Sequence, residues 1–245
     1  RKMMMVMAGI FGVVLMAVLG TYYFRNKKRH RKTALFCKAL ATSVSGLLLL
    51  GYLYGARTGE SAGGVLSGWA DGVILEAAFA GTLAAIVFYM AADVLLECRF
   101  IWGAVCFGIG HICMAAGFLL SGESVLHPEK SGGYTVDAGL LCLALAVFAA
   151  LMASACAALH RYFHSLKKKK LFYPLLAYVL ILSLMAALAV TAGGLIPAAG
   201  GLCFAVSDVL LGRNRLGKRR SAVCGAFVLI LYYAAVYLFA MRLWI

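Results

Sequence analysis

Charge is scarce in this sequence, and acidic side chains are the scarcest of all. Only 13% of the 245 residues are charged, and nine Asp and Glu stand against 23 Lys and Arg. Soluble domains carry about 25% charged residues, so this composition excludes an ordinary water-soluble domain. The eight cysteines form no CxxC pair, and we interpret them as small buried side chains and not as a metal site.

Motifs of cofactor-dependent catalysis are missing as well. The chain has no HExxH, GxSxG, Walker or Rossmann pattern, and it predicts no metal and no cofactor. Its net charge of +14 could indicate a nucleic-acid partner. The basic residues, however, fall in short runs between apolar segments, which excludes a nucleic-acid-binding domain and is typical of membrane loops.

Apolar runs of membrane-spanning length fill most of the chain. Hydrophobic residues make up 64% of it, and the mean hydropathy is +0.94. A transmembrane helix needs about 20 apolar residues. We therefore predict an all-α fold, a polytopic membrane helical bundle that forms a single integral membrane domain. Its eight transmembrane helices are predicted over residues 3–24, 33–54, 72–97, 100–120, 135–158, 171–191, 193–212 and 222–243.

The predicted loops alternate in charge. Loops 25–32, 161–170 and 213–221, together with Arg99, carry 17 Lys and Arg on one side of the membrane, whereas the other side carries five. The positive-inside rule predicts that the richer side faces the cytoplasm and that both termini face out. We expect a multi-pass protein of a bacterial inner (plasma) membrane.

Two stretches of the chain repeat each other. Residues 92–96 read Ala-Asp-Val-Leu-Leu, and residues 207–211 read Ser-Asp-Val-Leu-Leu. They close the third and the seventh predicted spans, which are four spans apart and run in the same direction. We interpret this match as two four-helix halves, about 1–121 and 134–245, in a parallel pseudo-repeat.

Three ionisable side chains are predicted at one depth within the membrane. Asp93, Asp208 and Lys38 each lie five or six residues from a basic loop residue, which is roughly 7–9 Å along a helix. A charge at a helix centre costs about 2.5–3.5 kcal/mol on insertion scales, so each needs a partner or a function. Thr42 and Ser45 follow Lys38 on one helix face, and we expect that face to point inward.

Two interpretations of this layer stay open. In the first, Lys38 pairs with one aspartate to hold helices together, or it extends to the cytoplasmic surface. In the second, both aspartates line a polar cavity on the cytoplasmic side. Two carboxylates in a low-dielectric site repel each other, so one keeps its proton. Such a pair supplies both an acid and a base for catalysis.

Other polar residues of the predicted helices are weaker candidates. His111 lies mid-membrane in the fourth span, and it is either a hydrogen-bonded core residue or a group that orients substrate or carries a proton. Tyr232 and Tyr233 lie at a similar depth in the eighth span, where one hydroxyl could reach the cavity. Glu97 lies one turn beyond Asp93 at the membrane boundary, and we expect it to be solvated.

The order of these residues resembles a known family. Lys38 opens the second span, an aspartate segment (88–96) closes the third, and a glycine-rich helix follows with Gly110-His111. A second aspartate segment (200–208) comes late in the chain, before a last helix that contains Tyr232-Tyr233. From about residue 38 to 238, the chain resembles the YhhN-like lysoplasmalogenases, a family of eight-span membrane proteins.

The chain departs from the pattern of that family in two places. Ala39 follows Lys38, where the family usually has proline. Ala235 and Val236 stand shortly after the tyrosine pair, where the family often has glutamine. The second departure removes a polar group that could line the cavity.

The resemblance implies hydrolysis of the sn-1 vinyl-ether bond of a lysoplasmalogen, a lysophospholipid of the bilayer, to a fatty aldehyde and a glycerophospho-base. Asp93 and Asp208 would form the catalytic pair, in which one protonates the vinyl carbon and the other stabilises the cation and activates water. The remaining candidates would bind substrate, with the two arginines at the rim as phosphate ligands: Lys38, His111, Tyr232, Tyr233, Arg99 and Arg213.

Three other functions compete with this one. A proton-coupled transporter would use the same buried acids, but it needs a pathway that reaches both faces. A different lipid hydrolase could depend on a metal bound by His111 and the aspartates. A third possibility is a module that binds lipid without catalysis, in which the aspartates pair structurally. Labelling of engineered cysteines in the outer half tests the first function, and chelators test the second.

Overall fold

The eight predicted transmembrane helices are present in the computed structural model, which describes residues 2–58, 69–129, 133–168, 170–217 and 220–244. Each has the length and hydropathy needed to cross a membrane, so the prediction of an all-α polytopic membrane bundle is confirmed. The long helices are α1 (Lys2–Asn26), α2 (Arg31–Thr58), α4 (Trp69–Cys98), α5 (Phe100–Leu120), α6 (Ala138–Leu159), α8 (Phe172–Thr191), α9 (Leu195–Leu216) and α10 (Ala222–Met241).

The two shortest connections between helices fall where the sequence predicts them. Arg99 alone separates α4 from α5, and it is extended, with φ −142° and ψ 93°. Three residues separate α8 from α9. One of these, Gly193, has a φ of +71°, a left-handed conformation that glycine adopts without strain. These short turns keep each pair of consecutive helices antiparallel and adjacent.

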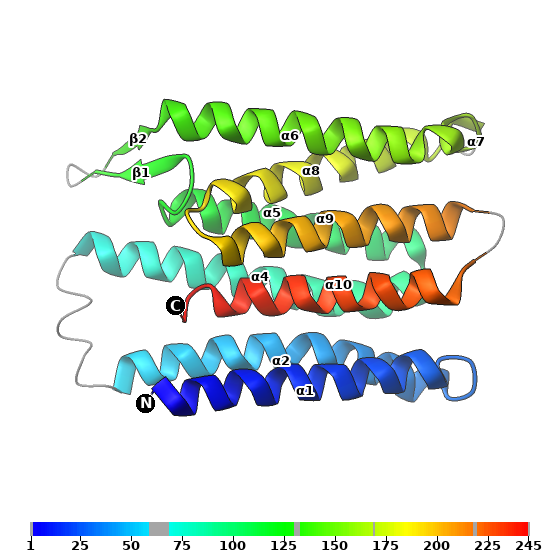
Figure 1. The fold of residues 1–245 in the computed structure, drawn as a ribbon, viewed down its shortest axis with the longest axis horizontal. Coiled ribbons are helices and arrows are strands. Elements are labelled where there is room, and N and C mark those ends of the chain that lie inside the picture. The colour runs from blue at the N-terminus through cyan, green and yellow to red at the C-terminus, as the bar shows by residue number, and fades with distance from the viewer. Residues whose placement is uncertain (1, 59–68, 130–132, 169, 218–219, 245) are drawn as a thin grey trace.

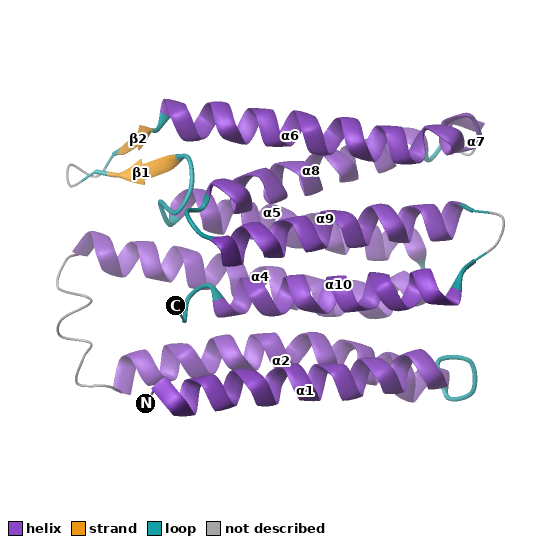
Figure 2. Cartoon of the chain, in the orientation of Figure 1, coloured by secondary structure: helices purple, strands orange, loops and turns teal. Residues whose placement is uncertain are grey.

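Two connections differ from the predicted loops. The helix predicted from residue 135 begins only at Ala138, because β1 (Leu126–Pro128) and β2 (Tyr134–Val136) pair in an antiparallel hairpin. Asp137 then caps α6 by accepting a hydrogen bond from the Leu140 N–H at 2.9 Å. The segment after α6 is helical and not a plain loop, as Figure 2 shows: η1 (His160–Tyr162) and α7 (Phe163–Lys168).

All eight long helices run between two opposite ends of the molecule (Figure 1). Both chain termini and the hairpin lie at one end. The α1–α2 and α9–α10 connections and α7, which carry basic residues, lie at the other end, and we call this the basic end. The charge alternation along the sequence therefore separates the two ends of the bundle. That the basic end faces the cytoplasm stays a prediction.

A buried arginine holds together the end opposite the basic end. Arg242 Nη2 donates a hydrogen bond to Thr82 Oγ1 at 3.1 Å, and Nη1 lies 3.6 Å from Glu123 Oε2. The guanidinium also stacks 4.0 Å from the centre of the Phe118 ring. These contacts tie the end of α10 to α4 and α5.

The helices follow the same order of neighbours in the two predicted halves. In the first half, α1 packs on α2, α2 on α4, and α4 on α5. In the second half, α6 packs on α8, α8 on α9, and α9 on α10. The halves meet where α5 packs on α8 and where α10 packs on α2. A parallel pseudo-repeat would produce this pattern, although the repeat itself stays a prediction.

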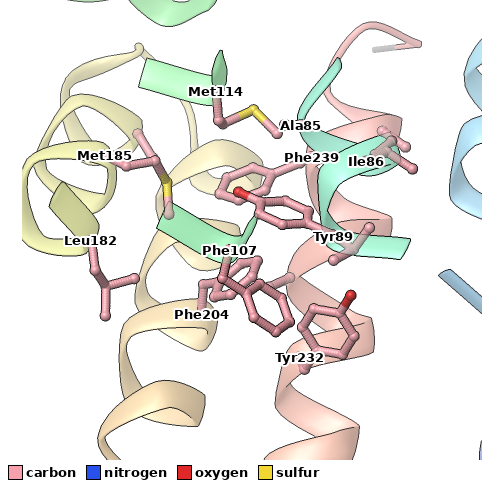
Figure 3. Close-up of a cluster of buried hydrophobic side chains, with 14 of the residues drawn as sticks. Ala85, Ile86, Tyr89, Phe107, Met114, Leu182, Met185, Phe204, Tyr232 and Phe239 are labelled. Carbon is pink, nitrogen blue, oxygen red and sulfur yellow. The ribbon is translucent and has the colours of Figure 1, made fainter. Parts of the chain in front are cut away.

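Aromatic side chains fill the middle of the bundle between the two ends. Tyr89, Phe204 and Phe239 are fully buried, and the Tyr89 and Phe204 ring centroids lie 5.0 Å apart. Figure 3 shows Phe107 and Tyr232 gathered beside these rings. The polar groups described below therefore lie against buried aromatic rings, where their electrostatic interactions are stronger than in water.

The contact between α4 and α5 generates a first prediction. A Cβ atom added at Gly81 would lie 2.6 Å from the Gly117 Cα. We expect Gly81→Ala to lower the free energy of unfolding by about 1–3 kcal/mol, because it overpacks a tight helix contact. Reversible unfolding in detergent measures this. In the control Gly51→Ala, the new Cβ meets nothing within 4 Å. Equal stability of the two variants would contradict the close packing of α4 on α5.

Candidate active site

A cavity of about 510 Å³ reaches from the basic end into the bundle. Asp93 of α4 and Asp208 of α9 both line it, at equivalent positions of the two repeated segments. Helical periodicity explains which neighbours join them. Asp208, Leu211 and Arg215 line the cavity at i, i+3 and i+7, as Arg31, Leu35 and Lys38 do at i, i+4 and i+7 on α2; such spacings place side chains on one helix face.

Asp93 lies in a buried network that joins α2, α4 and α10. Lys38 Nζ lies 3.3 Å from Asp93 Oδ1, and the two side chains are 7% and 1% exposed. Thr42 Oγ1 and Tyr232 OH donate hydrogen bonds to Asp93 Oδ2 at 2.5 and 2.9 Å. The prediction that the Lys38–Thr42–Ser45 face points inward is confirmed, because all three side chains are buried.

A cation and two hydroxyl donors converge on the Asp93 carboxylate, and all of them favour its ionised form. The Lys38 ammonium has this carboxylate as its partner and also lies 5.3 Å from the centre of the Tyr23 ring. Lys38 is thus buried and paired and does not extend to the surface. The Lys38–Asp93 pair lies at the inner end of the cavity.

Asp208 lies in a second network, which has no Lys or Arg partner among the described residues. Tyr178 of α8 donates a short hydrogen bond to Asp208 Oδ2. His111 Nε2 lies 3.6 Å from the same oxygen and 3.3 Å from Tyr178 OH. On the far side of the imidazole, Nδ1 lies 3.0 Å from Tyr89 OH. His111 therefore contacts Asp208 but does not itself line the cavity.

The two networks differ in the groups that lie beside the carboxyl group. Asp208 lies beside an imidazole, with His111 Nε2 3.6 Å from its Oδ2. Two carboxylates facing one low-dielectric cavity repel each other, and Lys38 already compensates Asp93. Asp93 thus has an ammonium partner, whereas Asp208 has an imidazole and a phenol as neighbours.

Aromatic rings separate the networks and close the cavity inward. Phe107 and Tyr232 line the cavity, and their ring centroids lie 5.6 Å apart in an edge-to-face arrangement. Behind them, Phe204 packs against His111 at 4.6 Å. In Figure 3, these three labelled rings lie together between α9 and α10. An apolar chain with a polar head would therefore meet an aromatic floor flanked by two carboxyl groups.

Three further predicted site residues lie outside the cavity lining: Tyr233, Arg99 and Arg213. Tyr233 does not line the cavity and instead donates a hydrogen bond to the Lys38 carbonyl at 3.3 Å. Arg99 and Arg213 are exposed and lie outside the cavity lining. Arg213 is two residues from Arg215, about 200° around the helix, and so it projects from another face. Val236, where the family often has a polar residue, is buried in the apolar core.

Several contributing residues escaped prediction. Glu97 is not simply solvated, because its Oε1 accepts hydrogen bonds from Tyr23 OH at 2.8 Å and from Arg215 Nη2 at 3.1 Å. Tyr178 is one of several tyrosines in apolar helices, and nothing in the sequence distinguished it as a partner of Asp208. Arg215 could have been found from its i+7 spacing to Asp208. Among the described residues, no three His, Cys, Asp or Glu side chains gather as a metal site would require.

Comparison with protein families gives a match over most of the chain. The model of the YhhN family matches residues 73–243, which run from the first turns of α4 to just beyond the end of α10 and include both aspartates. No curated protein and no solved structure matches the chain. The match thus includes both aspartates but not α1 and α2, which supply Lys38 and part of the cavity lining.

The Lys38–Asp93 pair generates a second prediction. Lys38→Met leaves a buried carboxylate without its cation, and removing one partner of such a pair costs about 3–5 kcal/mol. We expect a lower free energy of unfolding in detergent, and partial recovery when Asp93→Asn is added. Lys32→Met, on the same helix but exposed and outside the cavity, is the control. If Lys38→Met were as stable as Lys32→Met, the ion pair would not be buried.

Proposed function

Because the chain belongs to the YhhN family, we propose that it is a lysoplasmalogenase-like membrane hydrolase. Its substrate would be a lysoplasmalogen, and the bond cleaved would be the sn-1 vinyl ether, which gives a fatty aldehyde and a glycerophospho-compound. One observation supports this most strongly: the two intramembrane aspartates, from the two repeated segments, line one cavity. The proposal puts the basic end in the cytoplasm, as the positive-inside rule predicts.

The chemistry of a vinyl ether matches the groups around this cavity. A proton added to the β-carbon of the double bond leaves a cation that is shared between C1 and the ether oxygen. Water adds at C1 and loses a proton, and the hemiacetal then breaks its C–O bond to release the aldehyde and the glycerol hydroxyl. One water is consumed and the catalytic proton is returned. The reaction needs a positioned acid and a nearby negative charge.

We assign different roles to the two aspartates from the asymmetry of their surroundings. Asp208 would deliver the proton, because His111 lies beside it and no lysine or arginine is a competing partner of that carboxyl among the described residues. Asp93 would remain ionised beside Lys38, stabilise the cation and accept the proton from attacking water. His111 would reload Asp208 between turnovers, and Tyr178 would fix the orientation of that carboxyl.

A transporter is less well supported than a hydrolase by the shape of the cavity. Its described lining ends at Phe107 and Tyr232. Beyond these rings, buried apolar side chains of the core such as Phe118, Phe239 and Met114 pack together. Arg242 then ties the opposite end of the bundle. A substrate cavity for a bilayer lipid needs one entrance, whereas a carrier needs two.

The aspartate pair generates a third prediction. Asp93→Asn and Asp208→Asn should each reduce aldehyde release from a lysoplasmalogen by about a hundredfold or more, because each removes a group that acts in proton transfer or charge stabilisation. Asp137→Asn is the matched control, since asparagine also caps a helix well and Asp137 caps α6 away from the cavity. Full activity of both aspartate variants in folded, extractable protein would reject the proposed catalytic pair.

The competing metal-dependent hydrolase gives a fourth prediction. In the proposed reaction, the two carboxyl groups, His111 and water carry every proton transfer, so incubation with EDTA should leave the rate of aldehyde release unchanged. The rate is measured before and after dialysis against chelator. Loss of activity that added zinc restores would instead favour metal-dependent chemistry through His111.

A further inference from the structure

The mouth of the cavity carries an excess of positive charge. Near the basic end, five cationic side chains line it: Lys27, Lys28, Arg31, Arg215 and Arg220. Among the described lining residues, Glu97 is the sole carboxylate at the mouth. The other two carboxylates lie deeper, Asp93 by one helical turn from Glu97 and Asp208 by two turns from Arg215. A charged ligand group at the mouth would therefore lie near five cations and one carboxylate.

The one carboxylate of the mouth is already engaged. Glu97 Oε1 accepts hydrogen bonds from Tyr23 and Arg215. Arg31 donates to the backbone carbonyl of Glu97 at 2.8 Å, so its charge is not matched by a carboxylate. Lys27 lies 4.8 Å from the centre of the Phe24 ring and forms no ion pair within the described part of the chain. Several cations are thus available for an anion.

A phosphate fits this mouth better than an ammonium does. Lysine and arginine bind phosphate oxygens through short, charge-assisted hydrogen bonds. A choline or ethanolamine head group brings a positive charge within a few atoms of its phosphate. The ammonium would approach five cations. The one carboxylate of the described mouth that could pair with it is Glu97, which already accepts hydrogen bonds from Arg215 and Tyr23. Of the five cations, only Arg215 is partly buried, and the other four are exposed. Solvent therefore screens each charge, but the five cations line one concave opening, where their potentials add.

We propose that the cavity selects lysolipids whose head group is anionic and carries no ammonium, such as a phosphate monoester or a phosphoglycerol. Choline and ethanolamine lysolipids are poorer ligands. This inference rests on the proposed function: a lipid whose vinyl ether lies between the aspartates would have its phosphate nearer the mouth. It names the head group that the reaction itself leaves open.

A series of 1-alkenyl lysolipids with one chain and three head groups tests the selectivity. Purified protein in neutral detergent is given the phosphate monoester, the phosphoglycerol and the phosphocholine, and free aldehyde is measured. We expect kcat/KM to be about tenfold higher for the two anionic lipids, with a ratio that falls as salt is added. An equal or higher kcat/KM for the phosphocholine lipid overturns the inference.

Variants of the mouth separate the cavity from the general charge of the basic end. Lys27→Gln and Arg31→Gln should each reduce the preference for anionic head groups by about threefold. Arg29→Gln is the matched control, because Arg29 is exposed in the same loop but does not line the cavity. If Arg29→Gln lowered the preference as much as Lys27→Gln, the selectivity would come from the surface and the inference would be wrong.

Binding of uncleavable analogues distinguishes this inference from the proposed function. The 1-O-alkyl lysolipids with the same three head groups lack the vinyl ether, and their dissociation constants are measured by calorimetry. If no lipid releases aldehyde, the proposed function fails, while tighter binding of the anionic analogues still supports the selectivity. If all three analogues bind equally, the selectivity fails, while release of aldehyde keeps the function.

Discussion

A single buried ion pair determines how the rest of this site is organised. Lys38 Nζ and Asp93 Oδ1 lie 3.3 Å apart, and both side chains are almost fully buried, so removing either partner leaves the other in the bundle without its counter-charge. The pair joins α2 to α4, and the hydrogen bond from Tyr232 adds α10. Asp208 occupies the equivalent position of the second repeated segment but has His111 and Tyr178 as partners. Two similar aspartate segments thus place one carboxyl group beside a lysine and the other beside a histidine.

The membrane setting explains why both sites open toward the basic end. A charged lipid head group cannot enter the apolar core without partners. In the proposed complex, the cations at the cavity mouth would bind the phosphate, and the hydrocarbon chain of the lipid would lie among apolar helices. The aromatic floor of Phe107 and Tyr232 limits how deep the polar part can go. Water, the second reactant, reaches the carboxyl groups by the same route, so one opening serves both substrates of the proposed hydrolysis.

Much of the fold was predictable, because membrane helices are determined by local composition. Apolar length gave the eight spans, and Arg99 and Gly193 marked the tight breaks. The depth of Asp93, Asp208 and Lys38 followed from counting residues. Partners across the bundle were harder, because a helix face shows which way a residue points but not what it meets. Tyr178, Glu97 and Arg215 acquire their roles only when α8, α4 and α9 come together. Arg99 and Arg213 were misplaced at the rim because loop charge alone does not distinguish one side of a helix end from another.

The transfer of a proton to carbon is the central claim, and hydrogen from the solvent can be followed into the product. Purified protein is incubated with a lysoplasmalogen in D₂O, and the released aldehyde is reduced at once and examined by mass spectrometry. We predict one solvent deuterium on the carbon next to the former carbonyl, because the carboxyl that protonates this carbon exchanges its hydrogen with solvent. Aldehyde that carries no deuterium at that carbon would contradict the account.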